Sequence, residues 1–297
     1  MGFKDELSSF PHAIVKFNEP MKKHTGLGVG GEAEYYAEVK SLYGLNTLSL
    51  LASEYKVPFK VVGFGTNLLV SDNGYKGLVI NMSKINDVFF KRDTVRAMAG
   101  ASLEKLIKFT VDHKLSGVEC LSGIPATVGG AVVMNAGAFG HNISDYIETV
   151  ETLKDGKLKI YNKEDCKFGY RTSRFFGKKE IVVSASFNFI EKDRESLISS
   201  VRTYEDIRKS IQPTGRSCGS VFKNPKQTSA GMLIEKSGLK GLVIGGAKIS
   251  EKHGNFIITT PRATAMDVYN LIITAKMKIK DEFQIELKEE VEFVGEF

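Results

Sequence analysis

The sequence predicts an α+β fold with more than one domain. Stretches in which apolar residues recur at helical spacing mix along the chain with short apolar runs typical of buried strands. The length of 297 residues is more than one small core can organise. Apolar residues make up 42% of the chain and charged residues 26%, which is the balance of an ordinary globular protein and excludes a disordered chain.

Four stretches carry apolar residues at helical spacing: residues 41–55, 102–115, 197–204 and 264–279. Ser41 and Ser102 are suited to cap the first two helices, because a serine hydroxyl accepts hydrogen bonds from the first helical turn. Thr264 and Asp267 form the beginning of a capping box for the last helix. These caps predict where three of the helices begin.

Strands are predicted where apolar residues form short runs or alternate with polar ones: residues 59–62, 68–70, 78–81, 158–161, 181–190 and 285–294. The alternation is strictest in residues 181–190, where Val183, Ala185 and Phe187 fall on one side. The polar stretch 191–195 follows without any periodicity, and we predict a domain boundary there.

Composition excludes several classes of function. The net charge of +6 favours anionic ligands such as phosphates, but it is too small and too scattered to indicate nucleic-acid binding. The three cysteines form no CxxC pair or Cys/His cluster, which argues against a disulfide framework and against a bound metal. No apolar run approaches the roughly 18 residues of a membrane span, and the N-terminus lacks a signal-peptide core. We therefore predict a cytoplasmic protein that does not bind membranes.

Residues 26–31 (GLGVGG) fit the glycine fingerprint of dinucleotide-binding folds, yet their context does not. That fingerprint follows a strand and opens a helix. Here the preceding residues 22–25 are polar, and the following Ala33, Tyr35 and Ala37 alternate as in a strand. We interpret residues 26–31 as turn glycines.

Two other glycine loops are better placed to bind an anion. Residues 63–67 (GFGTN) directly follow a predicted strand, so that backbone N–H groups, Thr66 and Asn67 can surround a phosphate. Residues 122–130 (SGIPATVGG) form a second such loop, and the pair suits a pyrophosphate. A plain β-turn explains the first loop equally well, since glycine and asparagine also favour turns. The small residues 131–138 indicate close packing against a helix or against a flat cofactor ring.

Taken together, the two loops resemble the FAD-binding segments of the vanillyl-alcohol-oxidase-like flavoproteins. Five further segments resemble one family within that superfamily, the UDP-N-acetylenolpyruvoylglucosamine reductases: residues 134–140 (MNAGAFG), 170–175 (YRTSRF), 219–225 (GSVFKNP), 230–236 (AGMLIEK) and 253–256 (HGNF). The resemblance runs from about His24 to the C-terminus. The short distance between segments 170–175 and 219–225 is similar to that in the shorter branch of the family, which lacks a tyrosine loop over the substrate.

The resemblance implies an FAD-binding domain with two lobes, residues 1–82 and 83–192, and a C-terminal α+β substrate-binding domain, residues 193–297. NADPH reduces the flavin, and hydride then passes to the enolpyruvyl double bond of a UDP-amino sugar, UDP-N-acetylglucosamine enolpyruvate. The implied reaction belongs to peptidoglycan precursor synthesis, and hence to cell-wall formation, cell shape and cell division. We expect non-covalent FAD, because neither glycine loop contains a histidine or cysteine that could attach the ring. We expect no obligate protein partner.

The resemblance assigns cofactor binding to residues of the two loops: Gly63, Gly65, Thr66, Asn67, Gly123, Ile124, Pro125, Thr127, Gly129 and Gly130. It assigns substrate binding to Tyr170, Arg171, Lys223 and Asn224. Ser220 corresponds to the family's proton donor, although a serine after a glycine is also typical of a turn. Arg171 corresponds to the arginine that binds the substrate carboxylate, a task that suits a planar guanidinium. Arg174 on the same segment is its rival, and a surface ion pair is the alternative role.

Glu290 corresponds to the third catalytic residue, but the strand pattern favours its neighbour. In a regular strand, Leu287 and Val291 face one side together with Glu289, whereas Glu290 faces the other side. The family has proline where this chain has Glu289, and a bulge or bend there resets the alternation. We follow the motif and predict Glu290, with Glu289 left open as the alternative.

The chain departs from the family pattern in two further places. Ala126 stands where the family has glycine, and residues 26–29 lack the family's arginine. Two alternative functions also stay open. Another flavin oxidoreductase, acting on a sugar or alcohol, would share both glycine loops but lack the segments with Arg171 and Ser220. A non-catalytic nucleotide-binding module would keep the fold and bind no flavin.

Overall fold

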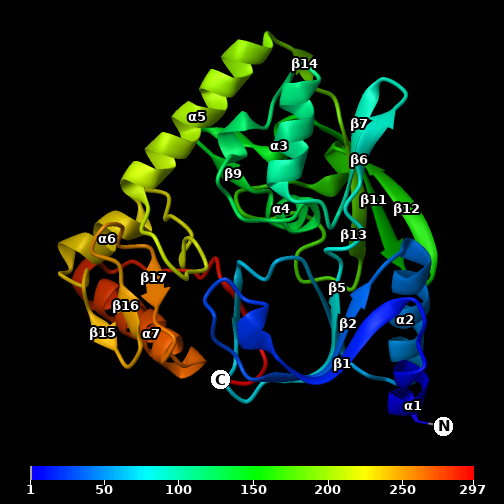
Figure 1. The fold of residues 1–297 in the computed structure, drawn as a ribbon. Helices are drawn as coiled ribbons and strands as arrows, with labels where there is room; N and C mark the ends of the chain where they lie inside the picture. The colour runs from blue at the N-terminus through cyan, green and yellow to red at the C-terminus, as the bar shows by residue number, and fades with distance from the viewer. Residues whose placement is uncertain (1) are drawn as a thin grey trace. The chain divides into compact units, whose positions relative to one another are not determined.

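The computed structural model describes residues 2–297, which form two compact units (Figure 1). Unit 1 consists of Met1–Lys16, Tyr35–Phe64 and Gly77–Ile207, and unit 2 of Phe17–Glu34, Gly65–Lys76 and Arg208–Phe297. This division differs from the consecutive segments 1–82, 83–192 and 193–297 expected from the sequence. The last transition falls between residues 207 and 208, inside a helix, and not at the polar stretch 191–195.

Unit 1 holds four complete helices and most of a fifth: α1 (Phe3–Ser8), α2 (Leu42–Glu54), α3 (Leu103–Asp112), α4 (Val128–Met134) and α5 (Arg194–Ile211). Its five-stranded antiparallel sheet has the strand order β12 (Lys157–Asn162), β11 (Ile147–Lys154), β13 (Ile181–Phe187), β7 (Thr94–Met98) and β6 (Val88–Lys91). A second sheet has the order β1 (Ala13–Pro20), β2 (Glu32–Val39), β5 (Tyr75–Asn81) and β3 (Phe59–Val62). Two short strand pairs complete the list: β8 (Leu115–Ser116) with β14 (Ile190–Glu191), and β9 (Gly137–Ala138) with β10 (His141–Asn142).

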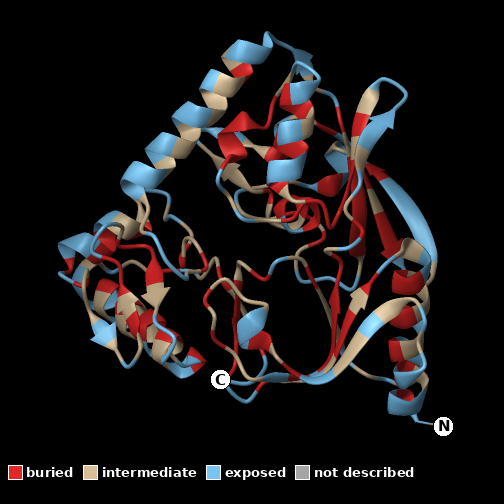
Figure 2. Ribbon diagram, viewed as in Figure 1, coloured by how far each residue is buried: buried red, intermediate tan, exposed pale blue. Residues whose placement is uncertain are grey.

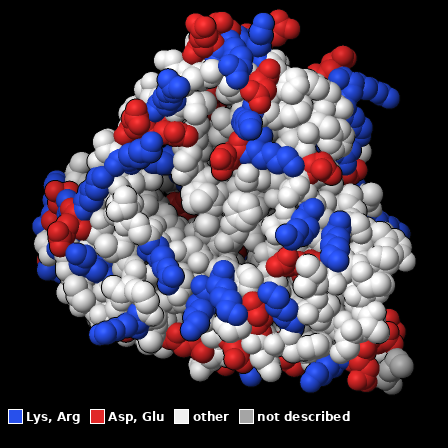
Figure 3. Space-filling model, viewed as in Figure 1, with Lys and Arg blue, Asp and Glu red and all other residues white. Residues whose placement is uncertain are grey.

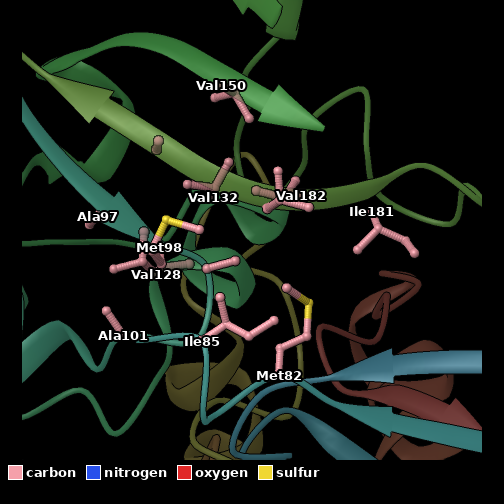
Figure 4. Close-up of a cluster of buried hydrophobic side chains, with 14 of the residues drawn as sticks. Met82, Ile85, Ala97, Met98, Ala101, Val128, Val132, Val150, Ile181 and Val182 are labelled. Carbon is pink, nitrogen blue, oxygen red and sulfur yellow. The ribbon is translucent and has the colours of Figure 1, made fainter. Parts of the chain in front are cut away.

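The core of unit 1 joins the large sheet to the helices that cover it. Val128 and Val132 of α4 lie in one apolar cluster with Met98 of β7 and Val182 of β13 (Figure 4). The predicted caps begin the helices as expected, because Ser41 accepts the Gly44 amide at 3.1 Å and Ser102 accepts the Lys105 amide at 2.9 Å. Burying this cluster supplies the main stabilisation of the unit.

Unit 2 is built on the helices α6 (Ala230–Lys236) and α7 (Ala265–Phe283) and on two small sheets. One is antiparallel, with β15 (Val243–Ile244), β16 (Ala247–Ile249) and β17 (Ile257–Thr259); the other pairs β4 (Leu68–Val70) with β18 (Glu292–Val294) in parallel. The predicted capping box is confirmed: Thr264 Oγ1 accepts the Asp267 amide at 3.1 Å, and the Asp267 carboxylate accepts the Thr264 amide at 3.0 Å. The buried face of α7, with Val268, Leu271 and Ile272, packs into the core of this unit.

Two strand predictions need correction. Residues 285–294 were expected to form one strand, but only Glu292–Val294 do so. Gln284 ends α7 in the left-handed conformation, and the chain then crosses unit 2 with a single bridge before it pairs with β4. Strand β13 ends at Phe187 and not at residue 190. Residues 181–185 are buried without interruption, in a strand at the centre of its sheet that also contacts α4.

The interpretation of residues 26–31 as turn glycines is confirmed. Gly28 and Gly30 have φ values of 64° and 123°, which side-chain-bearing residues rarely adopt. Strand β2 follows them directly in the chain, so these glycines do not open a helix. A dinucleotide fingerprint therefore has no structural basis here.

Charged side chains of both signs are mixed over the face of the molecule shown in Figure 3, so neither sign dominates that face. Helix α5 is the most exposed long helix, and Leu197 is its only fully buried residue (Figure 2). Within residues 2–297, no helix is both long and apolar enough to cross a membrane, and no cluster of His, Cys, Asp and Glu is arranged to hold a metal ion.

Candidate active site

The two glycine loops meet in unit 1, where Gly63 lies against Thr127. A Cβ atom on Gly63 would lie 2.2 Å from Thr127 Oγ1 and 2.7 Å from its Cγ2, so no other residue fits there without a shift of the second loop. Asn81 Nδ2 donates to the Gly63 carbonyl at 3.1 Å and fixes the first loop. Thr127 caps α4 by accepting the Gly130 amide at 3.3 Å. The structure thus brings one predicted cofactor residue from each loop into direct contact.

The glycines at the start of α4 have different roles. A Cβ on Gly129 would lie 2.8 Å from the Ala99 Cβ, so this glycine allows α4 to approach the chain just after β7. Gly130 is exposed, and a Cβ there would meet only Thr127 Oγ1 at 3.5 Å. Gly123 and Pro125 are exposed in the same loop. The small residues therefore serve helix packing at Gly129 and leave bare backbone at Gly123 and Gly130.

Ala126, which replaces the family's glycine, causes no backbone strain. Its φ is not positive, so alanine adopts the required conformation without penalty. Its side chain packs against the core of unit 1, and its carbonyl accepts the Leu103 amide at 2.9 Å. The added methyl is therefore accommodated inside the protein.

The remainder of the first loop belongs to unit 2. A Cβ on Gly65 would lie 2.0 Å from the His24 carbonyl oxygen, which requires glycine at this position. Thr66 and Asn67 are half-buried. Asn67 Nδ2 donates to the Glu290 carbonyl at 3.0 Å, and the Asn67 carbonyl accepts the Glu292 amide at 2.9 Å. Asn67 therefore connects the predicted cofactor loop to the segment that carries Glu290.

These residues fit a flavin dinucleotide on steric and chemical grounds. A long anionic ligand needs backbone that is open to solvent, and Gly123 and Gly130 are both exposed. In unit 1 the cofactor residues would be Gly63, Gly123, Ile124, Pro125, Thr127 and Gly130, and in unit 2 they would be Gly65, Thr66 and Asn67. Gly129, which was predicted with them, is buried against Ala99. The isoalloxazine ring would supply hydride transfer, which no protein side chain can perform.

Arg171 is held in a strained conformation by the end of α4. Its φ of 52° lies in the left-handed region, which costs energy for a residue with a side chain. Arg171 Nη2 donates to the Gly137 carbonyl at 2.9 Å. Asn135 Nδ2 donates to the Gly169 carbonyl at 3.0 Å, and Ser173 Oγ donates to the Val133 carbonyl at 2.7 Å. Three hydrogen bonds thus fasten the arginine loop to the last residues of α4 and to the segment that follows it, residues 133–137.

Arg171 and its rival Arg174 have different neighbours in the structure. Arg174 lies over the ring of Tyr161, 4.0 Å from its centroid, and donates to the Asp165 carbonyl at 2.9 Å. Arg171 lies beside Tyr170, whose ring centroid is 5.4 Å away and whose side chain is 53% exposed. Both arginines therefore lie beside a ring and donate to a backbone carbonyl, but the ring beside Arg174 is the buried Tyr161, whereas the ring beside Arg171 is the accessible Tyr170.

Ser220 lies in unit 2 on an irregular extended segment. Ser220 bridges to Phe256 and Phe222 bridges to Glu289, both antiparallel. The Lys223 amide donates to the Lys288 carbonyl at 2.9 Å, and the Asn224 side chain accepts the Ala230 amide at 3.0 Å at the start of α6. The segment that carries Ser220, Lys223 and Asn224 therefore runs beside the segment that carries Glu289 and Glu290.

The backbone at Glu289 and Glu290 departs from a regular strand. The Val221 carbonyl accepts two successive amides, from Glu290 at 2.8 Å and from Val291 at 3.3 Å, which is the pattern of a bulge. Glu289 pairs with Lys276 of α7, with a nitrogen–oxygen distance of 2.5 Å. The regular alternation is therefore broken at this point, and Glu289 is committed to a structural ion pair.

Cys218 lies two residues before Ser220 and is fully buried, with a thiol pKa of about 12. Desolvation is the main cause of this raised pKa, and the negative charge of Glu290 is a smaller one. The Glu290 carboxylate is therefore close enough to influence the interior beside Ser220. The thiol is neutral at physiological pH and is not a nucleophile.

The sequence did not reveal the roles of three polar side chains. Asn135 and Ser173 hold the arginine loop, and Asn255 holds the backbone of Phe222. Asn135 and Asn255 both lie in segments that resemble the reductase family, 134–140 and 253–256, and this was the available signal. Their partners are backbone atoms far away in sequence, which no motif encodes.

Comparison with known proteins agrees with this arrangement. Residues 212–294 match the C-terminal domain of UDP-N-acetylenolpyruvoylglucosamine reductase, and residues 33–160, which contain both glycine loops, match an FAD binding domain. A UDP-N-acetylenolpyruvoylglucosamine reductase of Listeria innocua is 37% identical over 97% of this chain and 98% of its own length. The corresponding protein of Caldanaerobacter subterraneus is 42% identical over 94% of this chain and 93% of its own length.

A solved structure is similar over nearly the whole chain. The crystal structure of UDP-N-acetylenolpyruvylglucosamine reductase from Thermus caldophilus has a TM-score of 0.83 and 36% identity, and it covers 95% of this chain and 100% of the other. The prediction of an α+β flavoprotein enzyme from the sequence is thereby confirmed. The chain belongs to the family of UDP-N-acetylenolpyruvoylglucosamine reductases.

Proposed function

We propose that this protein catalyses the NADPH-dependent, FAD-mediated reduction of UDP-N-acetylglucosamine enolpyruvate to UDP-N-acetylmuramate, a step of peptidoglycan precursor synthesis. Relatives that are named for this activity are similar to the protein over nearly the full length of the chain. The observation that supports the proposal best is the hydrogen bond between the backbones of Val221 and Glu290. Val221, the residue after the predicted proton donor Ser220, thereby contacts the backbone of Glu290, the residue predicted to supply the catalytic carboxylate.

Arg171 binds the substrate carboxylate in the proposed mechanism. FAD, when bound, would supply the hydride chemistry for the enolpyruvyl double bond, with NADPH as the source of the hydride. As that bond is reduced, negative charge develops on the carboxylate side of the substrate, and a guanidinium stabilises it by charge-assisted hydrogen bonds. The fastening of Arg171 to Gly137 and of its loop to Asn135 keeps the guanidinium in place, so little reorganisation is needed during the reaction.

Ser220 donates the proton to the α-carbon, and Glu290 assists at the same centre. A hydroxyl is a weak acid, so it needs an environment that stabilises the alkoxide or returns a proton to it. Lys223, on the same segment, provides positive charge and binds the diphosphate of the UDP group together with Asn224. Tyr170 is exposed and contributes an aromatic surface to the substrate.

We also propose that residues 1–82 and 83–192 hold FAD and that residues 193–297 bind the UDP-amino sugar. FAD is held without a covalent bond, so acid precipitation of the protein should release the flavin into the supernatant. Colour that stays in the pellet would contradict this. A cytoplasmic location, and the absence of membrane, nucleic-acid and obligate protein partners, stay predictions.

One assay tests the proposed function directly. NADPH consumption should depend on UDP-N-acetylglucosamine enolpyruvate, and mass spectrometry should find a product heavier by two hydrogen atoms. The main rival is a flavin oxidoreductase for sugars or alcohols, which would oxidise such a substrate without NADPH. Flavin reduction by glucose or a simple alcohol, combined with no reaction of the enolpyruvyl substrate, would favour that rival.

A further inference from the structure

Asn255 is a buried residue whose side-chain hydrogen bonds both go to the segment that carries Ser220. The residue is 3% exposed. Its side-chain Nδ2 donates to the Phe222 carbonyl at 2.7 Å, and its Oδ1 accepts the Phe222 amide at 2.9 Å. Its own carbonyl accepts the Val221 amide at 2.9 Å. One asparagine therefore satisfies three backbone groups within the two residues that follow Ser220.

The network continues from these residues to Glu290. The Val221 carbonyl accepts the Glu290 amide at 2.8 Å, and the Glu290 carbonyl accepts Asn67 Nδ2 at 3.0 Å. An uninterrupted path of hydrogen bonds thus runs from Asn255 through Val221 and Glu290 to the predicted cofactor loop. All of these residues belong to unit 2.

The Ser220 segment needs a side chain to fix it because it lacks a regular ladder. Around Ser220 only isolated bridges occur, to Phe256 and, two residues later, to Glu289. A strand in a sheet is held in register by repeated backbone pairs, and this segment has too few of them. An asparagine side chain carries the donor and the acceptor of a peptide group, so Asn255 supplies the missing pair at Phe222.

We propose that Asn255 is a positioning residue that holds Ser220 in register with Glu290. The proposal rests on the proposed function for the catalytic roles of those two residues. Its structural part stands separately: removal of the Asn255 amide should loosen both backbone segments, whatever reaction the protein catalyses. Asn255 is proposed to act only through the backbone of Val221 and Phe222, without contact to the reacting atoms.

The first readout is amide hydrogen exchange of the full-length protein, which does not depend on activity. Asn255→Asp keeps an acceptor for the Phe222 amide but loses the donor to the Phe222 carbonyl, and Asn255→Ala loses both. Exchange should rise about tenfold or more in the peptides that contain Val221 and Glu290, as expected for the loss of one or two buried hydrogen bonds. Asn255→Asp keeps the test available if Asn255→Ala does not fold.

Ser250→Ala is the matched control. Ser250 is 2% exposed, and its hydroxyl accepts the Lys252 and His253 amides near Asn255 without touching the Ser220 segment. Its replacement should raise exchange around residues 250–254 and leave the Val221 and Glu290 peptides unchanged. Equal exchange of the Val221 and Glu290 peptides in the wild type and in Asn255→Asp would overturn the proposal.

The second readout separates positioning from general damage. In Asn255→Asp, flavin reduction by NADPH should stay within about threefold of the wild type, while reduction of the enolpyruvyl substrate falls at least about tenfold in kcat. Increased exchange with unchanged kcat in an active enzyme would show that Asn255 is only structural. If the wild-type protein does not reduce the enolpyruvyl substrate but exchange still increases in Asn255→Asp, the proposed function is overturned. The structural role of Asn255 in holding the Ser220 segment then remains supported.

Discussion

The backbone carbonyl of Val221 accepts the amide of Glu290 at 2.8 Å, so the residue after Ser220 is joined to the predicted catalytic carboxylate residue. The same carbonyl accepts the Val291 amide at 3.3 Å, which is the pattern of a bulge. In a regular strand, Glu289 and Glu290 would face opposite sides. The family motif favours Glu290, whereas the alternation of a regular strand favours Glu289. Because the strand is irregular at this point, its alternation does not decide between the two residues. The two adjacent glutamates can be compared directly.

Glu290→Gln should damage the reduction of the enolpyruvyl substrate and spare flavin reduction by NADPH. Glu289→Gln should leave both steps within a few-fold of the wild type, because Glu289 pairs with Lys276. Loss of that partly exposed pair should lower the free energy of unfolding by at most about 1 kcal/mol. Rapid kinetics of the two half-reactions and urea unfolding provide the measurements. The assignment to Glu290 fails if Glu289→Gln is the variant that loses the second half-reaction.

Arg171→Lys should lower kcat/KM for the enolpyruvyl substrate by about tenfold to hundredfold, since a lysine cannot form the planar double contact with a carboxylate. Arg174→Lys should stay within about threefold of the wild type, because Arg174 is engaged by Tyr161 and the Asp165 carbonyl. Steady-state kinetics of both variants test this contrast. A larger loss in Arg174→Lys would exchange the roles of the two arginines.

Gly130→Ala should separate cofactor binding from folding. The new Cβ meets nothing closer than Thr127 Oγ1 at 3.5 Å, and alanine favours a helix over glycine by up to about 1 kcal/mol. The protein without flavin should therefore be as stable as the wild type or slightly more so. If the exposed backbone at Gly130 lies against FAD, the Kd for FAD should rise by about tenfold or more.

Gly129→Ala serves as the control, because it should lower the stability of the flavin-free protein without directly weakening FAD binding. Its Cβ would lie 2.8 Å from the Ala99 Cβ, an overpacking that typically costs about 1–3 kcal/mol. Thermal unfolding of the flavin-free proteins and titration with FAD distinguish the two variants. An unchanged Kd for FAD in Gly130→Ala would remove Gly130 from the cofactor site.

The sequence predicted the elements whose signals are local. Ser41, Ser102 and the Thr264–Asp267 box each begin a helix, because a cap is encoded within four residues. The run at residues 59–62 became β3, and residues 68–70 became β4. Residues 26–31 could be recognised as turn glycines because polar residues precede them and a strand-like alternation follows them. A dinucleotide fingerprint would instead follow a strand and open a helix.

What the sequence could not predict depends on contacts between distant residues. The last strand shortened to Glu292–Val294 because its partner, β4, is a three-residue strand more than two hundred positions earlier. Arg171 adopts a left-handed backbone conformation, and the side chains of Asn135 and Asn255 donate hydrogen bonds to distant backbone carbonyls. These features depend on atoms that come close together only in the folded chain. The family resemblance located Ser220, Arg171 and Glu290, but it gave no reason for their geometry.

The central claim is that Ser220 delivers the proton to the substrate and takes no part in flavin reduction. In Ser220→Ala, flavin reduction by NADPH, followed by stopped-flow absorbance, should stay within a few-fold of the wild type. Turnover of the enolpyruvyl substrate should fall by at least about a hundredfold, as expected for the loss of a positioned acid. Ser220→Cys should recover part of the activity, because a thiol is the stronger acid at similar reach. If flavin reduction in Ser220→Ala falls as far as turnover does, the serine is a coenzyme-binding or folding residue and not the acid.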